Sequence, residues 1–224
     1  MTPPRYPRIP HLVGGRGTRD DLVLAPDDVR SLLEREVVVE EKLDGANVAL
    51  WAEDGRVRAT TRGGPYATDR ANQRGPLLAW AAQHADNLMR ALHGAHALYA
   101  EWLLLSHSML YERLPSFLVV FDVLRADGTF ATVGERDDRC GGAGLSTPPL
   151  LARGVLGGLA AVEALLGRSA VGSGPAEGVV VRPVDGRAPR IAKLVRAGFD
   201  RLDDASWQAG RPRNRLVDQE RSWR

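Results

Sequence analysis

A single lysine beside a glycine-containing turn is the part of this chain whose chemistry can be anticipated first. Lys42 belongs to the stretch Glu-Lys-Leu-Asp-Gly-Ala-Asn at residues 41–47, which follows the apolar run 37–39. Because β-forming residues flank it on both sides, we expect the turn to lie within a sheet and the lysine to be partly desolvated. Desolvation lowers the pKa of an ammonium group, and the free amine can form a bond to phosphorus. An ordinary hairpin turn contains the same Asp-Gly pair, so that alternative stays open on this segment alone.

Four further segments place charged side chains where strands are expected. They are an arginine before two glycines at Arg62-Gly63-Gly64, Glu101 within an apolar run, Glu177 at the start of the run 178–182, and Lys193 with Arg196 three residues later. An arginine beside glycines lets a guanidinium and backbone N–H groups meet one phosphate. Unpaired ionic groups in apolar surroundings are costly, so we expect these to pair with one another or with a charged ligand and a metal ion.

The elements that must position these groups follow from periodicity and turn residues. Strands are predicted at 37–40, 47–52, 56–62, 97–103, 117–124, 129–133, 177–182 and 190–195, and helices at 27–36, 70–92, 155–166 and from about 203 onward. Glycine-containing turns at 53–55, 127–128 and 185–186 join neighbouring strands, and a glycine-rich loop is expected near 141–142. Because most strands are joined by hairpins, the predicted class is α+β with an antiparallel or mixed sheet.

Length and composition predict one globular domain spanning 1–224, with the charged motifs within 37–196 and a basic tail at 197–224. From residue 187 to the end there are ten Arg or Lys against five Asp or Glu, which suits a polyanionic partner. Arginine-rich solvated surface is the alternative explanation of that bias. The single cysteine excludes a disulfide framework, and no apolar run is long enough for a membrane span. We therefore expect a soluble, cytoplasmic protein that does not contact membranes.

Taken together, the segments resemble the ordered motifs of the covalent nucleotidyltransferase superfamily, which comprises polynucleotide ligases and mRNA capping enzymes. The resemblance is carried by residues 42–47, Arg62-Gly63, Glu101, 117–122, 177–182 and Lys193. Asparagine at position 47 resembles the RNA ligase 2-like branch, since other branches usually carry arginine there. The resemblance implies the ATP-grasp-like ligase adenylylation fold, without the oligonucleotide-binding barrel of DNA ligases.

The family chemistry implies an ATP-dependent RNA ligase. Lys42 would attack the α-phosphorus of ATP and hold AMP, which would pass to an RNA 5′-phosphate before a 3′-hydroxyl seals the strand. Lys193 would stabilise charge on the α-phosphate, and Glu177 would contact Mg²⁺ or Mn²⁺. The resemblance assigns nucleotide binding to Glu41, Asp44, Gly45, Asn47, Arg62, Glu101, Phe121 and Lys193, with Phe121 stacked on adenine.

Some features leave alternatives open. Ile191 stands where this branch often carries a lysine, which favours a degenerate nucleotide- or RNA-binding module without turnover. A ligase of DNA or mixed nicks is a third reading. His107, Arg113 and Arg196 are candidate RNA contacts, although the segment 106–113 could equally be a loop or short helix that covers the sheet. The candidate protein partner of such a short ligase is an end-healing kinase–phosphatase.

Overall fold

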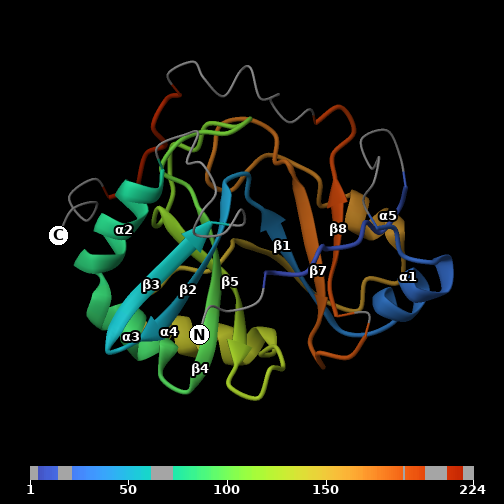
Figure 1. Cartoon of the computed structure of the whole chain (residues 1–224). Helices are drawn as coiled ribbons and strands as arrows, with labels where there is room; N and C mark the ends of the chain where they lie inside the picture. The colour runs from blue at the N-terminus through green and yellow to red at the C-terminus, as the bar shows by residue number, and fades with distance from the viewer. Residues whose placement is uncertain (1–4, 15–21, 62–72, 189, 200–210, 219–224) are drawn as a thin grey trace. The chain divides into compact units, whose positions relative to one another are not determined.

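Two four-stranded antiparallel sheets carry the fold, each in its own unit of the chain (Figure 1). The structure is a computed structural model that describes residues 5–14, 22–61, 73–188, 190–199 and 211–218. Unit 1 comprises Met1–Tyr6, Asp44–Thr147 and Leu202–Arg224, and unit 2 comprises Pro7–Leu43 and Pro148–Arg201. The predicted α+β class is confirmed, and the pairings between the strands of both sheets are antiparallel.

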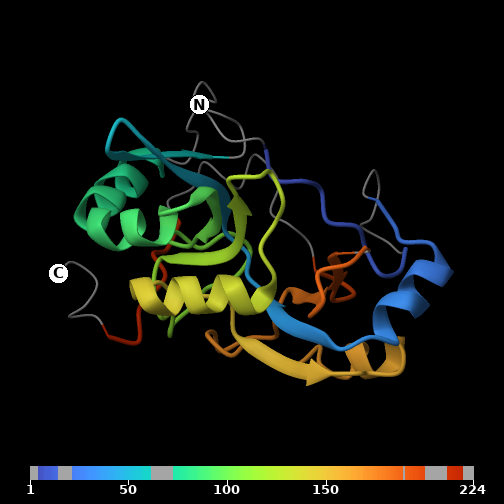
Figure 2. The same ribbon diagram turned by 90° about the horizontal axis from the view of Figure 1, so that it is seen from below.

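Unit 2 contains a sheet in the order β6-β1-β7-β8. Its elements are α1 (Pro26–Leu33), β1 (Val37–Lys42), β6 (Leu150–Gly154), α5 (Leu159–Glu163), β7 (Gly178–Pro183) and β8 (Ala192–Val195). Alternate strand residues point to one face and form the core, including Val37, Val39, Val179 and Val181. Leucines of α1 and Val162 of α5 complete that core, so both helices pack on the same face of the sheet (Figure 2).

The opposite face of this sheet carries charge. Glu40 pairs with Val180, which pairs in turn with Lys193, and Lys42 pairs with Gly178. Residues directly opposite each other on neighbouring strands point to the same face. Glu40, Lys42 and Lys193 therefore share the face that turns away from the apolar core. The alternation of valine and charged residues in β1 thus determines which side can do chemistry.

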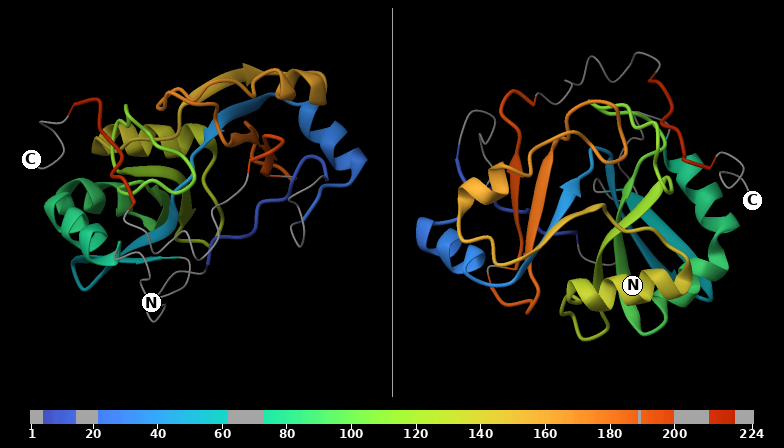
Figure 3. Two further views of the ribbon diagram at one scale, coloured as in Figure 1. Left: turned by 90° about the horizontal axis from the view of Figure 1, so that it is seen from above. Right: turned by 180° about the vertical axis from the view of Figure 1, so that it is seen from behind.

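Unit 1 contains a sheet in the order β3-β2-β4-β5, with three helices packed against it (Figure 3). Its elements are β2 (Ala46–Glu53), β3 (Arg56–Thr61), α2 (Arg74–Gln83), α3 (Ala85–Leu92), β4 (Ala95–Trp102), β5 (Leu118–Arg125) and α4 (Val133–Ala143). The predicted hairpin between β2 and β3 is confirmed. Asp54 (φ 52°) and Gly55 (φ 68°) close it in the left-handed region, which two-residue hairpin turns require.

One face of this second sheet is apolar and meets the helices. Leu50 and Leu98 pair across β2 and β4 and are fully buried, and Trp80 of α2 contacts Trp102 of β4 edge-on. Helix α2 lies beside β3, α3 beside β4 and α4 beside β5. Trp102 pairs with Ala46, and at the next position of the register Asn47 pairs with Glu101. Asn47 and Glu101 therefore share the other face of the sheet.

Several predicted elements have different bounds. The helix predicted at 70–92 is two helices, because His84 leaves the helical conformation (φ −106°, ψ 22°). The imidazole of His84 stacks on Trp80, and its Nδ1 lies 2.8 Å from the Trp80 carbonyl oxygen. The helix predicted at 155–166 shortens to Leu159–Glu163. The helix predicted from 203 lies largely outside the described residues, and 211–218 contains no helix.

Two predictions in the middle of the chain were wrong. Residues 129–133 form no strand beyond the single bridge between Leu124 and Phe130. Gly141 and Gly142 lie inside α4 rather than in a loop, because a capping box between Thr132 and Glu135 starts that helix. Strand β6 was not predicted. Among the described residues, no helix is both long and apolar enough to cross a membrane.

The Asp-Gly pair after Lys42 is not a hairpin turn. Strand β1 belongs to the sheet of unit 2 and β2 to the sheet of unit 1, so Asp44 and Gly45 lie where the chain leaves one sheet and enters the other. The hairpin alternative for residues 41–47 was therefore wrong. The reason is that both strands find their hydrogen-bonding partners elsewhere, on segments far along the chain.

Candidate active site

Lys42 and Glu177, which the sequence singled out separately, form an ion pair. Lys42 is the last residue of β1, and its Nζ lies 2.9 Å from each carboxylate oxygen of Glu177. Glu177 immediately precedes β7, whose first residue pairs with Lys42 in register. The Glu177 side chain is fully buried, whereas 18% of the Lys42 side chain is exposed. The buried carboxylate thus holds the Lys42 amine at the strand end. An amine acts as a nucleophile only in its deprotonated form.

The backbone around Glu177 is held by the neighbouring strand. Gly178 leaves no room for a side chain, because a Cβ there would lie 2.9 Å from the Cα of Val195 and closer still to the Leu194 carbonyl oxygen. Arg196 donates from its backbone N–H to the Glu177 carbonyl oxygen (2.9 Å) and from Nε to the Ala176 carbonyl oxygen (3.1 Å). Arg196 therefore supports the Glu177 strand end from within unit 2. Its predicted contact with RNA stays a prediction.

Lys193 lies in β8, on the same face as Lys42. The segment before α1 borders that strand, since the Lys193 N–H donates to the Pro10 carbonyl (2.9 Å) and the Leu12 N–H donates to the Lys193 carbonyl (2.8 Å). Lys193 is buried, and so is Ile191 two residues earlier. At that second position the chain has an apolar side chain.

A second buried ion pair on this face was not anticipated. Arg182 Nε lies 3.2 Å from Glu40 Oε2, and both side chains are at most 5% exposed. Paired charges avoid the large penalty of an isolated buried ion. The sequence does show both residues in apolar runs, and that is the signal that could have identified them. With it, the face carries Glu40, Lys42, Arg182 and Lys193.

Glu41 points away from that face and anchors a loop. Its carboxylate accepts hydrogen bonds from Ser169 Oγ (2.5 Å) and the Ala170 N–H (2.8 Å). The same hydroxyl of Ser169 accepts from the Gly172 N–H (2.9 Å). Burial raises the pKa of Glu41, although both hydrogen bonds to its carboxylate oppose that shift. The loop that Glu41 holds, residues 167–176, leads directly into Glu177. A contact of Glu41 with nucleotide stays a prediction.

Asp44 and Gly45 are fixed by hydrogen bonds within unit 1. The Asp44 N–H donates to Tyr111 Oη (2.8 Å), and Asp44 Oδ2 accepts from the Ser108 N–H (2.6 Å). The Gly45 N–H donates to Glu101 Oε1 (3.0 Å). A Cβ on Gly45 would lie 2.6 Å from a methyl carbon of Leu103, so close approach rather than backbone conformation requires the glycine. Glu101 thus holds the turn while sharing a face with Asn47.

Phe121 lies at a β-bulge. Its neighbours Val120 and Asp122 pair with Ala100 and Tyr99, which are consecutive, so Phe121 is the extra residue on β5. Bulges of this kind redirect a side chain and often lie next to functional sites. The Phe121 carbonyl oxygen accepts from Arg136 of α4 (3.1 Å). This local geometry could not be recognised in the apolar run 117–122.

Tyr6 is a neighbour of Phe121 that sequence reasoning missed. Its ring meets Phe121 edge-on, with ring centroids 4.9 Å apart, and its hydroxyl donates to Asp122 Oδ2 (2.6 Å). Tyr6 also packs against Tyr99, whose pKa is raised to about 12 by burial and by the charge of Asp122. Around Phe121, the polar face of this sheet is therefore lined by aromatic rings. No pattern near residue 6 signals this contact.

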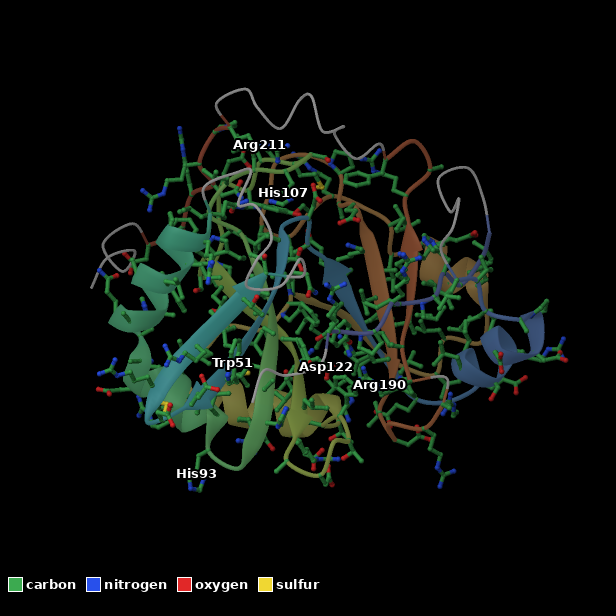
Figure 4. All side chains as sticks on the ribbon, in the orientation of Figure 1. Trp51, His93, His107, Asp122, Arg190 and Arg211 are labelled. Carbon is green, nitrogen blue, oxygen red and sulfur yellow. The ribbon has the colours of Figure 1, made fainter. Side chains whose placement is uncertain are left out.

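The remaining predicted site residues have mixed outcomes. His107 is buried, with Nε2 3.2 Å from Gln73 Nε2, and it lies near Arg211, which donates to the Ser106 carbonyl oxygen (3.1 Å; Figure 4). Arg113 is exposed. Arg62 lies outside the described residues. Cys140 is buried in α4, and burial raises its pKa to about 11, which does not suit a nucleophile.

Binding of a metal ion at this site depends on which oxygen ligands are available. Within the described residues, no group of three or more His, Cys, Asp or Glu side chains is arranged to hold one. Glu177 supplies hard carboxylate oxygens, but it is a single ligand. Mg²⁺ is usually bound by one or two carboxylates together with waters and substrate phosphates. Glu177 therefore fits a metal ion that arrives with a nucleotide rather than one held by the protein alone.

Comparison with known proteins gives a family match and solved structures of similar fold. The family model described as RNA ligase matches residues 35–195. The structure of Naegleria gruberi RNA ligase with PPi is 17% identical, with a TM-score of 0.54, and the match covers 87% of this chain and 61% of that chain. A mutant of that ligase with ATP and Mn is 17% identical with a TM-score of 0.53, and the match covers 76% of this chain and 51% of that one.

The chain thus spans about half the length of most of these solved structures. At such low identity the structural similarity concerns the fold alone. Comparison with curated proteins gives no match.

Proposed function

Because the chain belongs to the RNA ligase family, we propose that it is an ATP-dependent RNA ligase that works through a lysyl-AMP intermediate. The observation that carries this proposal is the Lys42–Glu177 pair, with Nζ 2.9 Å from both carboxylate oxygens at the end of β1. The pair joins residues 135 positions apart, so it is a product of the fold and not of local sequence.

Lysine usage supports the same assignment. Lys42 and Lys193 are the only lysines in the chain, among 30 Lys and Arg residues. A guanidinium cannot be deprotonated in a protein, whereas an amine can become a nucleophile. This chain has arginine at its other 28 Lys or Arg positions and lysine at two positions of the family motifs, 42 and 193.

The proposed reaction has three steps. Nζ of Lys42 loses a proton and forms a bond to the α-phosphorus of ATP, and the bond to pyrophosphate breaks. In the second step an RNA 5′-phosphate oxygen displaces Lys42 from AMP. In the third, an RNA 3′-hydroxyl attacks that 5′-phosphate, AMP leaves, and the strand is sealed.

The charged face of unit 2 supports the reaction at phosphorus. Lys193 stabilises negative charge that develops on the α-phosphate, which is the term worth most in such reactions. Glu177 orients Lys42, and it is the residue that would hold Mg²⁺ or Mn²⁺. A bound divalent ion would neutralise phosphate charge. Buried Arg182 and Glu40 keep the face electrostatically paired.

The polar face of unit 1 supports recognition of the nucleoside. We assign Glu101 and Asn47 to the ribose and Phe121 to adenine stacking, with Asp44 and Gly45 in the turn beside them. Glu41 and Arg62 complete the proposed nucleotide-binding set. The bulge at Phe121 and the cross-strand pairing of Asn47 with Glu101 support these roles.

RNA is the proposed polymer substrate. Along the C-terminal segment, Arg213 and Arg215 are exposed and alternate with buried Asn214 and Leu216. Exposed cations at alternate positions of an extended segment suit the phosphates of one strand. Arg113 is a further exposed cation and the predicted contact of the loop 106–113.

Labelling with ATP tests the proposal. The protein is incubated with α-labelled ATP and Mg²⁺ or Mn²⁺, and the adduct is followed by denaturing gel and intact mass. We expect a covalent gain of one AMP, which Lys42→Ala abolishes. Since only two lysines are present, peptide mapping of the adduct has just one competing site, Lys193. Absence of label in protein free of pre-bound AMP, with ATP, GTP and NAD all tried, would instead favour a binding module without turnover.

A further inference from the structure

The C-terminal segment 211–218 is hydrogen-bonded along its length to the loop 103–114 (Figure 3). The Ser106 N–H donates to the Pro212 carbonyl (2.9 Å), and the Asn214 N–H donates to the Leu104 carbonyl (3.0 Å). Farther along, the Arg215 N–H donates to the Tyr111 carbonyl (2.8 Å). These hydrogen bonds join two segments of unit 1 that are about a hundred positions apart in the sequence.

Asn214 is the centre of this contact. Its Oδ1 accepts from the Tyr111 N–H (2.8 Å), and its Nδ2 donates to the Leu103 carbonyl (2.8 Å). The residue is only 2% exposed. The Asn214 side chain therefore connects two separate positions of the loop, Leu103 and Tyr111, through its two hydrogen bonds.

The loop in turn holds Asp44. Tyr111, whose backbone Asn214 binds, accepts the Asp44 N–H with its hydroxyl (2.8 Å). The Ser108 N–H donates to the Asp44 carboxylate (2.6 Å). A third link comes from Arg211, which donates to the Ser106 carbonyl and interacts favourably with the charge of Asp44. Asp44 lies two residues after Lys42, so its backbone limits where that lysine can be placed.

We propose that Asn214 is a positioning residue for the reaction of Lys42, acting through the Tyr111 hydroxyl on the Asp44 backbone. This inference rests on the proposed function, because it concerns the rate at which Lys42 takes up AMP. A nucleophile displaced by about 1 Å can lose as much as a hundredfold in rate. The segment 211–218 therefore contributes to the chemistry although none of its residues belongs to the motifs.

Two substitutions separate this role from simple stabilisation. Asn214→Ala removes both side-chain hydrogen bonds, and Tyr111→Phe removes only the hydroxyl that holds Asp44. The double variant completes a cycle, and Val217→Ala is the matched control, since Val217 lies in the same segment with its side chain 70% exposed. For each protein, the single-turnover rate of AMP transfer to Lys42 is measured at saturating ATP, per folded molecule, alongside thermal unfolding.

We expect each single substitution to lower the rate of AMP transfer about tenfold, with the control unchanged. Because both act on one route, the double variant should be no slower than the slower single variant. Multiplied effects in the double variant, or an unchanged rate in folded Asn214→Ala, would overturn the inference. If Asn214→Ala does not fold, an unchanged rate in Tyr111→Phe overturns it equally.

The outcome is distinguishable from failure of the proposed function. If the unmodified protein forms no AMP adduct on Lys42, the proposed function fails. If it forms the adduct, Lys42→Ala does not, and Asn214→Ala and Tyr111→Phe react at the rate of the unmodified protein, the function stands and only the role of Asn214 is refuted.

Discussion

The two sheets of this protein share an architecture but differ in the side chains on their polar faces. Each has four antiparallel strands and one apolar face covered by helices. In unit 2 the other face holds ionic groups, namely Glu40, Lys42, Arg182 and Lys193. In unit 1 it holds Asn47 and Glu101 together with the aromatic cluster around Phe121.

Under the proposed function, this difference divides two tasks between two similar sheets. Cations and a buried carboxylate can stabilise charge that changes during a reaction at phosphorus. Hydrogen-bonding and aromatic groups recognise a base and a sugar, whose charges do not change. Substitutions on the charged face of the unit 2 sheet should therefore affect the chemical step, and those on the polar face of the unit 1 sheet should affect the concentration of ATP required.

Lys42→Ala should have the largest effect. Adduct formation should fall below detection, since no other side chain at the end of β1 can replace the amine. The buried Glu177 carboxylate also loses its cation, which should lower the free energy of unfolding by up to about 3 kcal/mol. Adding Glu177→Gln should restore stability, measured by urea unfolding, but not labelling. Labelling that persists in Lys42→Ala would show that Lys42 is not the nucleophile.

Lys193→Ala should come next, with a rate of AMP transfer reduced about a hundredfold or more at saturating ATP. Lys193→Arg keeps the charge but not the compact ammonium, so it should recover only part of the rate. Single-turnover labelling measures both. Arg187→Ala, whose side chain is 83% exposed, is the control. A change in apparent ATP affinity with no change in the saturated rate would assign Lys193 to ATP binding. It would contradict the assignment of the chemical step to the charged face of unit 2.

Glu101→Gln tests unit 1. Glutamine retains an oxygen to accept the Gly45 N–H, so the turn should stay in place while the charge is lost. We expect the ATP concentration for half-maximal labelling to rise about tenfold, as expected for a hydrogen bond to a charged group. The rate at saturating ATP should change much less, and titration with ATP separates the two quantities. A loss confined to the saturated rate would contradict the division of tasks.

The smallest effect concerns pH and Glu41. Burial raises the pKa of Glu41 above its ordinary value of 4.5, so the folded protein binds this proton more tightly than the unfolded chain does. Ionised Glu41 therefore destabilises the fold at neutral pH, and that penalty disappears as pH falls through the folded pKa toward 4.5. The stability difference between the unmodified protein and Glu41→Gln should shift in favour of the former on acidification. Urea unfolding at several pH values measures it, and a difference that does not vary with pH would contradict the raised pKa.

Much of the fold could be predicted because its signals are local. The hairpins at 53–55 and 185–186 follow from glycine-containing turns between β-forming runs, and both are confirmed. Strand β6 was missed because its residues alternate weakly, with Arg153 and Gly154 among them, and it pairs only because β1 offers a free edge in unit 2. The division into α2 and α3 at His84 involves a contact between its imidazole and the Trp80 carbonyl oxygen. The spacing of apolar residues along the sequence does not indicate such a contact.

The sequence by itself determined which residue types are available for chemistry and where they lie along strands. Order along the chain places Lys42 after one valine run and Glu177 before another. Composition gives the chain only two lysines. Tertiary structure alone decided the partners. Glu177 reaches Lys42 across 135 positions, and Asn214 reaches Tyr111 across 103. The reason is physical, since hydrogen bonds and ion pairs act over a few ångströms in space, whereas a sequence pattern records only neighbours along the chain.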